Sequence, residues 1–134
     1  MAGLVPDSHA DLLSDEKRAV AYLVTLMPDR TPQVTPVWFQ WDGGYIWINS
    51  ARGRVKDRNM RIHPQVALLI PDPADSDHFL QIRGIVLLIT EDGASQHANR
   101  LAQKYTGQAW TPNSPDEVRV RYKIKPEHIM VSQF

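Results

Sequence analysis

The sequence predicts a mainly β (α+β) protein in which an antiparallel sheet closes into a barrel and short helices lie at its flanks. About seven short segments have the apolar runs or the alternation typical of strands, and only two or three have helical spacing. Most connections between consecutive strands are short, which favours antiparallel pairing, and a sheet with this many strands usually closes into a barrel. A chain of 134 residues is about one domain, so we expect a single domain over residues 1–134.

The N-terminal third predicts one helix and two strands. Residues 7–19 predict a helix that Asp7 or Ser8 caps. Residues 20–27 are almost continuously apolar and predict the first strand. Residues 33–41 predict a second strand, which must bend or lie at an edge because its internal proline cannot donate to a ladder.

A hairpin and a short helix follow. Residues 42–44 contain two glycines and predict a tight turn onto the alternating strand 45–50. Gly53 breaks the alternation, and residues 55–62 then show helical spacing that Pro64 ends. The local prediction is therefore a strand, a tight turn and a short helix.

The C-terminal half predicts further strands around one helix. The expected elements are a buried strand over 66–70, a loop over 71–77, a long strand over 78–90 with a bulge at Gly84, a helix over 92–106 ended by Gly107, a loop over 110–116, and strands over 118–124 and 129–131 on either side of Pro126.

Composition excludes several classes of protein. The absence of cysteine excludes disulfides, thiolate metal sites and a cysteine nucleophile. Fifteen basic residues balance fifteen acidic ones, so nothing attracts the whole chain to nucleic acid. The N-terminus lacks the pattern of a secretory signal, and the apolar runs are far too short to span a membrane. We expect a cytoplasmic protein with no membrane span and no nucleic-acid partner.

No metal site is expected. The five histidines include no pair at a spacing of three or four residues, which a helical zinc site would use. Asp72, Asp75 and Asp77 resemble the start of a calcium loop. Two prolines interrupt this stretch, however, and it lacks the distal bidentate glutamate, so we interpret it as a polar loop.

The most distinctive stretch is basic and lies at the start of the short helix. It contains one acid, Asp57, against five cations: Arg52, Arg54, Lys56, Arg58 and Arg61. A solvated helix face is the plain interpretation. Cations at a helix start oppose the macrodipole, however, and like charges four residues apart repel, so stability does not require them there. We interpret the stretch as an anion site, most plausibly for phosphate, in which side chains and free N–H groups of the turn converge.

The second predicted strand offers a surface for a ring beside this anion site. Pro36 can leave neighbouring backbone groups unpaired, Thr35 adds a hydroxyl and Trp38 a flat face. The tryptophans alone would more often be packing residues. Together with the phosphate site they indicate a groove for a cofactor with a ring at one end and a phosphate at the other, as in flavins.

Six motifs in a set order resemble a known family. They are 33–39 (QVTPVWF), 42–50 (DGGYIWINS), 54–64 (RVKDRNMRIHP), 80–84 (LQIRG), 101–107 (LAQKYTG) and 121–127 (RYKIKPE). They resemble the flavin/deazaflavin oxidoreductases of the pyridoxamine-phosphate-oxidase-like split β-barrel class, and the likeness covers about residues 10–131. It is closest to the branch that uses coenzyme F420. Two positions depart from the family pattern: Met60 stands where leucine is usual, and His63 where an acid or asparagine is usual. Both lie on the helix, so they put the packing of the helix in question more than phosphate binding.

This resemblance implies an FMN-binding-like split barrel and a homodimer with its cofactor at the interface. Arg54 and Lys56 would hold the cofactor phosphate. The full set of implied cofactor-binding residues is Thr35, Pro36, Val37, Trp38, Ile48, Asn49, Ser50, Arg54, Lys56 and Asn59.

The resemblance further implies an F420H2-dependent reductase that passes a hydride to an unsaturated small-molecule acceptor. F420 is the expected cofactor, with FMN as the alternative. Five cations suit the oligoglutamate tail of F420, whereas the single phosphate of FMN needs fewer. No catalytic residue is identified, since nothing discriminates among Tyr22, Tyr45 and Lys56 as proton donors. An FMN-dependent enzyme and a non-catalytic protein that binds F420, flavin or haem remain alternatives.

Overall fold

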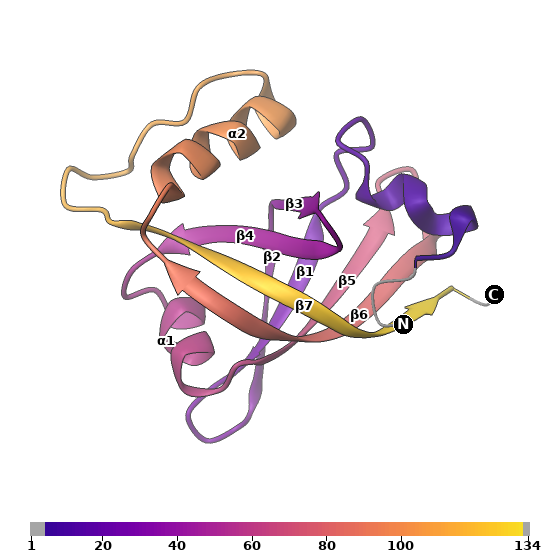
Figure 1. Ribbon diagram of the computed structural model, residues 1–134, viewed down its shortest axis with the longest axis horizontal. Coiled ribbons are helices and arrows are strands. Elements are labelled where there is room, and N and C mark those ends of the chain that lie inside the picture. Colours follow the sequence, from indigo (N-terminus) through magenta and orange to yellow (C-terminus); the bar gives the residue numbers. More distant parts are fainter. Residues whose placement is uncertain (1–4, 133–134) are drawn as a thin grey trace.

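A computed structural model describes residues 5–132, and its centre is one seven-stranded antiparallel sheet that curls on itself (Figure 1). The strand order is β2-β1-β5-β6-β7-β4-β3. The elements in chain order are η1 (Asp7–Leu13), β1 (Ala21–Leu26), β2 (Pro32–Val37), β3 (Phe39–Asp42), β4 (Tyr45–Ala51), α1 (Val55–Ile62), β5 (Gln65–Asp72), β6 (Asp75–Thr90), α2 (Ala94–Thr106) and β7 (Arg119–Val131). The mainly β split-barrel fold class is thereby confirmed.

Alternation along the strands builds the core. In β4, Ile46, Ile48 and Ser50 are buried, whereas the residues between them face outward. The paired strand β7 buries Tyr122 and Ile124 in the same way, in register with β4. Side chains from successive strands therefore fill the inside of the curl, as the period of two requires.

The long strands β6 and β7 bend where their register shifts. One shift lies between Arg83 and Gly84, so the irregularity expected at Gly84 is confirmed, with Glu127 of β7 as the extra residue. A Cβ atom at this glycine would overlap the carbonyl oxygen of Lys125, so only glycine fits between the two backbones. Pro126 lies opposite Gly84 at the same irregularity. A proline is tolerated there because the regular ladder is already interrupted. Strand β7 therefore runs through Pro126 as one strand, whereas two strands were predicted.

Three further boundaries differ from the prediction. The first helix is a short 3-10 segment that ends at Leu13 because Ser14 is extended, and no side chain caps its start. The predicted second strand is two strands, since Trp38 lies outside both β2 and β3. The predicted loop 71–77 is a tight turn, because β5 continues to Asp72 and β6 begins at Asp75.

The two α-helices lie at different places around the sheet (Figure 1). Helix α2 packs on the outer side of β4 and β7 and buries His97, Ala98 and Leu101. Helix α1 follows β4 directly and packs near β1. Within residues 5–132, no helix is long and apolar enough to cross a membrane.

Candidate functional site

The turn between β4 and α1 has the predicted form, but the backbone N–H groups of residues 52–54 are already bonded within the chain. The N–H of Arg52 donates to Val118 O at 2.9 Å, and the N–H of Arg54 donates to Ala51 O at 3.2 Å. The N–H of Gly53 donates to the carboxylate of Asp57 at 3.0 Å. The expectation of free N–H groups is therefore wrong for residues 52–54, where only side chains are available to an anion.

The five cations of the basic stretch point to different places. Arg52 pairs with Glu91, and Arg61 pairs with Asp57 at 3.1 Å. Arg58 is exposed and makes no ion pair with the described residues. Only Arg54 and Lys56 line a cavity that also reaches Trp38. Five cations therefore do not converge on one anion, and their number does not by itself indicate an oligoglutamate tail.

The Arg54–Trp38 cavity has a volume of about 370 Å³ and lies between the β2 edge, β4, the start of α1 and α2. It is lined by Pro36, Val37, Trp38, Asn49, Arg54, Lys56, Ala98, Leu101, Trp110, Thr111, Asn113 and Arg119. Cationic groups and the Trp38 ring thus share one cavity, which is the arrangement expected for a ring-and-phosphate ligand. Its volume is near the lower end of the range for small-molecule sites.

Lys56 is a half-buried cation whose charge no neighbouring carboxylate among the described residues neutralises. Burial lowers the pKa of its ammonium group, and the nearby positive charges of Arg54 and Arg119 lower it further. No carboxylate among residues 5–132 pairs with Lys56. A half-buried ammonium beside two guanidinium groups is unfavourable until an anion joins it, so this end of the cavity favours a negatively charged group.

Arg119 is a cavity residue that the sequence reasoning missed. It comes from β7, and its Nε donates to Asn49 Oδ1 at 2.8 Å. Its guanidinium also lies over the ring of Trp110, at 5.3 Å from the centroid. The available signal was the alternation of basic residues along 119–125, which puts them on one face of a strand.

Trp38 is held by the C-terminal end of α2. Its ring stacks on Tyr105, with centroids 5.1 Å apart and planes within 6°. The Tyr105 hydroxyl donates to Ala19 O at 2.6 Å and accepts from the Phe39 N–H at 3.3 Å. Burial raises the pKa of Tyr105 to about 12, so the phenol stays protonated and keeps both bonds. Helix α2 therefore fixes the break between β2 and β3.

The remaining predicted residues, Thr35, Ile48, Ser50 and Asn59, do not line the cavity. Ile48 is in the barrel core, and Ser50 is buried with its hydroxyl unpaired among the described residues. Thr35 is half-buried on β2. Asn59 is buried, and its amide donates to the Thr25 hydroxyl at 3.0 Å, which ties α1 to β1.

Asn49 connects the cavity to a buried histidine. Its amide donates to Ala94 O at 2.8 Å and lies 3.1 Å from His97 Nδ1. Burial lowers the pKa of His97 to about 4, with the charges of Arg121, Arg100 and Arg119 adding to the effect. A neutral ring that accepts at Nδ1 carries its proton at Nε2, which is buried without a partner among residues 5–132. A separate cavity of about 290 Å³ lies beside His97 and Trp47.

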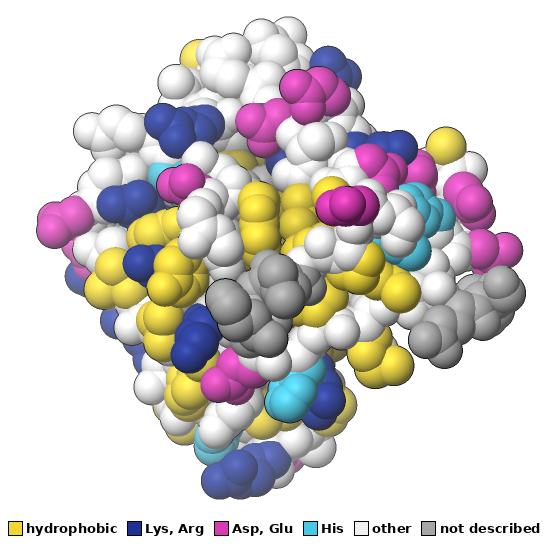
Figure 2. Space-filling model, turned by 45° about the vertical axis from the view of Figure 1, so that its right-hand side comes forward, with side chains coloured by type: hydrophobic (Ala, Val, Ile, Leu, Met, Phe, Trp, Pro, Cys, Tyr) yellow, Lys and Arg dark blue, Asp and Glu magenta, His cyan; other side chains and the backbone are white. Residues whose placement is uncertain are grey.

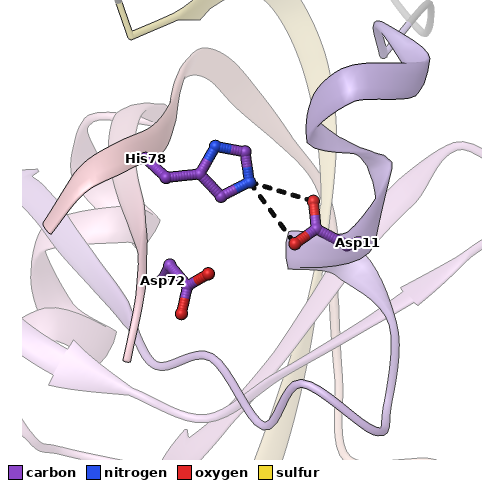
Figure 3. Close-up of side chains that lie close together, drawn as sticks. All are labelled: Asp11, Asp72 and His78. Carbon is purple, nitrogen blue, oxygen red and sulfur yellow. Dashed lines mark hydrogen bonds and ion pairs between the residues drawn. The ribbon is translucent and has the colours of Figure 1, made fainter. Parts of the chain in front are cut away.

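A second polar cluster joins Asp11 to Asp72 and His78, which lie far from it in the sequence (Figure 3). His78 Nε2 lies 3.0 Å from an Asp11 oxygen. The ammonium group of Lys17 lies 3.0 Å from Asp72 and 3.2 Å from Asp11. Because a lysine already supplies the positive charge, the cluster is an ion-pair network that attaches η1 to the β5–β6 turn.

The comparisons with known proteins agree with this architecture. An F420 reductase of known structure is 32% identical, with a TM-score of 0.84, over 94% of this chain and 98% of its own. A conserved hypothetical protein from Mycobacterium tuberculosis is 21% identical, with a TM-score of 0.74, over 97% of this chain and 86% of its own. A putative pyridoxamine 5'-phosphate oxidase from Listeria innocua is 24% identical, with a TM-score of 0.66, over 91% of this chain and 93% of its own. Among curated proteins, none matches the chain.

Fold and comparisons together define the class, that of the split-barrel flavin/deazaflavin oxidoreductases. The sequence model for pyridoxamine 5'-phosphate oxidase matches residues 5–132, which is nearly the whole chain. The chain therefore belongs to the pyridoxamine 5'-phosphate oxidase family.

Proposed function

We propose that this protein is an F420-dependent oxidoreductase that uses the Arg54–Trp38 cavity to hold its cofactor. The observation that carries the proposal is that one cavity joins Arg54 and Lys56 to Trp38. The 32%-identical F420 reductase supports the choice of cofactor. A bound F420H2 would supply a hydride to an unsaturated small-molecule acceptor.

The cationic end of the cavity would bind the cofactor phosphate. Arg54, Lys56 and Arg119 line this end, and each can offer charge-assisted hydrogen bonds. Such bonds contribute roughly 1.5–3 kcal/mol each. Asn49 holds the Arg119 guanidinium through its Nε, so the direction of that group is set before the ligand arrives.

The other end of the cavity would hold the ring. Pro36 and Val37 lie at the end of an edge strand, and Trp38 follows them outside the ladder. Backbone groups at such an edge can bond to the rim of a heterocycle. Trp38 is 38% exposed, so it offers apolar surface to a ring while Tyr105 holds it in place. Ile48 and Ser50, and Asn59 from α1, would support these walls from inside the barrel.

We further propose that the working form is a homodimer whose partner completes the site. A cavity of about 370 Å³ is small for a whole deazaflavin cofactor, so a second wall is needed. Tyr22, Leu69 and Met130 are 41%, 38% and 53% exposed and lie in one row across β1, β5, β6 and β7, in which the exposed Gln81 of β6 stands between Leu69 and Met130. Hydrophobic side chains mixed with basic ones also reach the surface in Figure 2. An apolar sheet face of this kind favours association.

Titration of the purified protein with F420 and, separately, with FMN tests the proposal. We expect saturable F420 binding at about micromolar concentration, near 8 kcal/mol of binding free energy. FMN binding in preference to F420, with a yellow protein on purification, would support an FMN-dependent enzyme. Absence of binding to either cofactor would reject both functions.

A turnover assay separates an enzyme from a storage protein. The F420H2-loaded protein is mixed with a panel of enones and quinones, and oxidation of the cofactor is followed by absorbance. Reduction of at least one acceptor faster than without protein is expected. Full F420 binding with no acceptor reduced would identify a protein that binds the cofactor without turnover.

A further inference from the structure

A second cavity lies between the N-terminal half of α2 and the sheet, and we call it the His97 cavity. It has a volume of about 290 Å³ and shares no lining residue with the Arg54–Trp38 cavity. Its lining includes Arg100 of α2, Arg121 of β7 and Trp47 of β4. Asp42 is the one acidic residue in this lining, so two positive charges stand against one negative charge.

The two guanidinium groups of this cavity have no carboxylate partner. Arg121 Nε donates to the backbone oxygen of Asp92 at 2.7 Å, and its guanidinium lies 4.6 Å from the centroid of the Trp47 ring. Arg100 is exposed, and neither arginine makes an ion pair with any residue in the range 5–132. Both arginines can therefore bind an anion through charge-assisted hydrogen bonds.

His97 adds a buried donor to the same cavity. Asn49 Oδ1 accepts from Arg119, so the Asn49 amide nitrogen faces His97 Nδ1, and the neutral ring carries its proton at Nε2. Nε2 is on the side of the ring turned away from Asn49, and His97 lines this cavity but not the Arg54–Trp38 cavity. His97 is 5% exposed, and its Nε2 has no hydrogen-bond partner among the described residues. An acceptor on a ligand would satisfy this donor, which is unfavourable while it is buried and unpaired.

We propose that the His97 cavity is a binding site for a small carboxylate with an apolar body. One carboxylate oxygen would accept from His97 Nε2–H and the other from Arg100 or Arg121. The apolar part would pack on Trp47, and the single negative charge would balance the net charge of the lining. Because Nε2 is buried, a neighbouring side chain must turn aside for this contact, as side chains at binding sites commonly do. The site is separate from the proposed cofactor cavity, so the inference does not rest on the proposed function.

A matched pair of probes tests the site. Benzoate and benzamide have nearly the same shape, but only benzoate carries a negative charge. Each probe is added to the wild-type protein near neutral pH, and the proton signal of His97 Nε2–H is followed by NMR. This signal reports directly on the donor that the carboxylate would bind.

We expect benzoate to move the signal downfield and saturably, with a dissociation constant of about 1 mM, because the proton gains a charged acceptor. Benzamide should bind at least about tenfold more weakly, since it lacks the charge that the two arginines attract. Equal binding of the two probes, or a signal that benzoate does not move, would overturn the inference. Sulfate that moves the signal as strongly as benzoate would also overturn it, because it would indicate a general anion site with no place for an apolar body.

Two matched variants locate the bound probe. Arg100→Gln removes an exposed guanidinium from the His97 cavity, so it should weaken benzoate binding about tenfold and leave F420 affinity within about twofold. Arg54→Gln makes the same change in the other cavity and should have the reverse effects. Loss of benzoate binding in Arg54→Gln but not in Arg100→Gln would contradict the assignment. The benzoate measurements decide this inference even if F420 does not bind, so the two proposals fail separately.

Discussion

At the scale of single residues, Asp57 is the one acid in the basic stretch and the anchor of its geometry. Its carboxylate accepts from the Tyr122 hydroxyl at 2.5 Å, from the Gly53 N–H at 3.0 Å and from Arg61 Nε at 3.1 Å. The Asp57 side chain is 2% exposed. One side chain thus joins the turn, the helix α1 and the strand β7, and it holds Arg54 and Lys56 at the edge of the cavity.

Replacement of Asp57 should be costly. In Asp57→Ala, the buried Tyr122 hydroxyl and the Gly53 N–H lose their acceptor, which should destabilise the fold by roughly 3 kcal/mol. Urea unfolding measures this difference. Asp116→Ala, at an exposed position, should change stability by about 0.5 kcal/mol or less. Equal stability of the two variants would refute the anchoring role of Asp57.

His97 should make stability depend on pH. Its pKa is lowered from 6.5 to about 4 in the folded protein, chiefly by burial, so the unfolded chain binds the proton more readily. Stability should therefore be full above about pH 6.5 and fall as pH decreases towards 4, with His97 contributing up to roughly 3 kcal/mol of the loss.

The variant His97→Gln isolates this effect from the carboxylates that also titrate in acid. The difference in unfolding free energy between wild type and variant should change by about 3 kcal/mol between neutral pH and pH 4. Direct NMR titration of the His97 ring gives a second measurement. A pKa near the ordinary value of 6.5 would show that the ring is not buried as described.

The sequence could identify Arg54 and Lys56 because a strand, a glycine turn and a helix start place them together by local geometry alone. It could not separate them from Arg52 and Arg58, because the pairing of Arg52 with Glu91 and the exposure of Arg58 depend on the fold, whereas the pair of Arg61 with Asp57 is local to the helix. Arg119 is close to the cavity only through the pairing of β4 with β7, which has no local signature.

At the scale of elements, the break at Trp38 is the feature that opens the cavity. The hydroxyl of Tyr105 bonds to Ala19 O, just before β1, and to the Phe39 N–H at the start of β3, and the ammonium group of Lys104 donates to Phe39 O at 3.0 Å. Helix α2 thereby holds the β3 side of the break and the chain just before β1. The sequence indicated a bend through Pro36, but the contact with α2 arises only in the folded chain.

Tyr105→Phe tests this attachment. The substitution keeps the stacked ring and removes the hydroxyl, so it should cost about 1–3 kcal/mol of stability and weaken cofactor binding by loosening Trp38. Tyr45→Phe is the matched control, because the Tyr45 hydroxyl makes no hydrogen bond with the described residues. Thermal unfolding and F420 titration measure both effects. If the two variants behave alike, α2 does not hold the break through this hydroxyl.

The elements with strong local signals were predicted well. Helix α2 has apolar residues at helical spacing and ends at Gly107, as expected. The segments with weaker signals were not, since the 3-10 form of η1 and the continuity of β7 depend on neighbouring strands. Pro126 was predicted to end a strand because the register shift beside it, where Glu127 is the extra residue of β7, arises only from the pairing with β6.

At the scale of the whole molecule, the outward row on β1, β5, β6 and β7 should be an interface between two copies of the chain. Leu69→Glu would bury a carboxylate in that interface and should convert a dimer into a monomer, as measured by light scattering after gel filtration. Ile62→Glu, at an exposed position of α1, should leave the dimer intact. A wild-type protein that is monomeric at every concentration would refute the interface.

The affinity for F420 of three single variants tests the role of the Arg54–Trp38 cavity most directly. Arg54→Ala and Lys56→Ala each remove a cation from its lining, whereas Arg58→Ala removes an exposed arginine one turn further along the same helix. The first two should weaken binding by about tenfold or more and the third by about threefold at most, because only cavity cations would contact the phosphate. Equal losses in all three variants, or none in any, would mean that the cofactor is not held in this cavity.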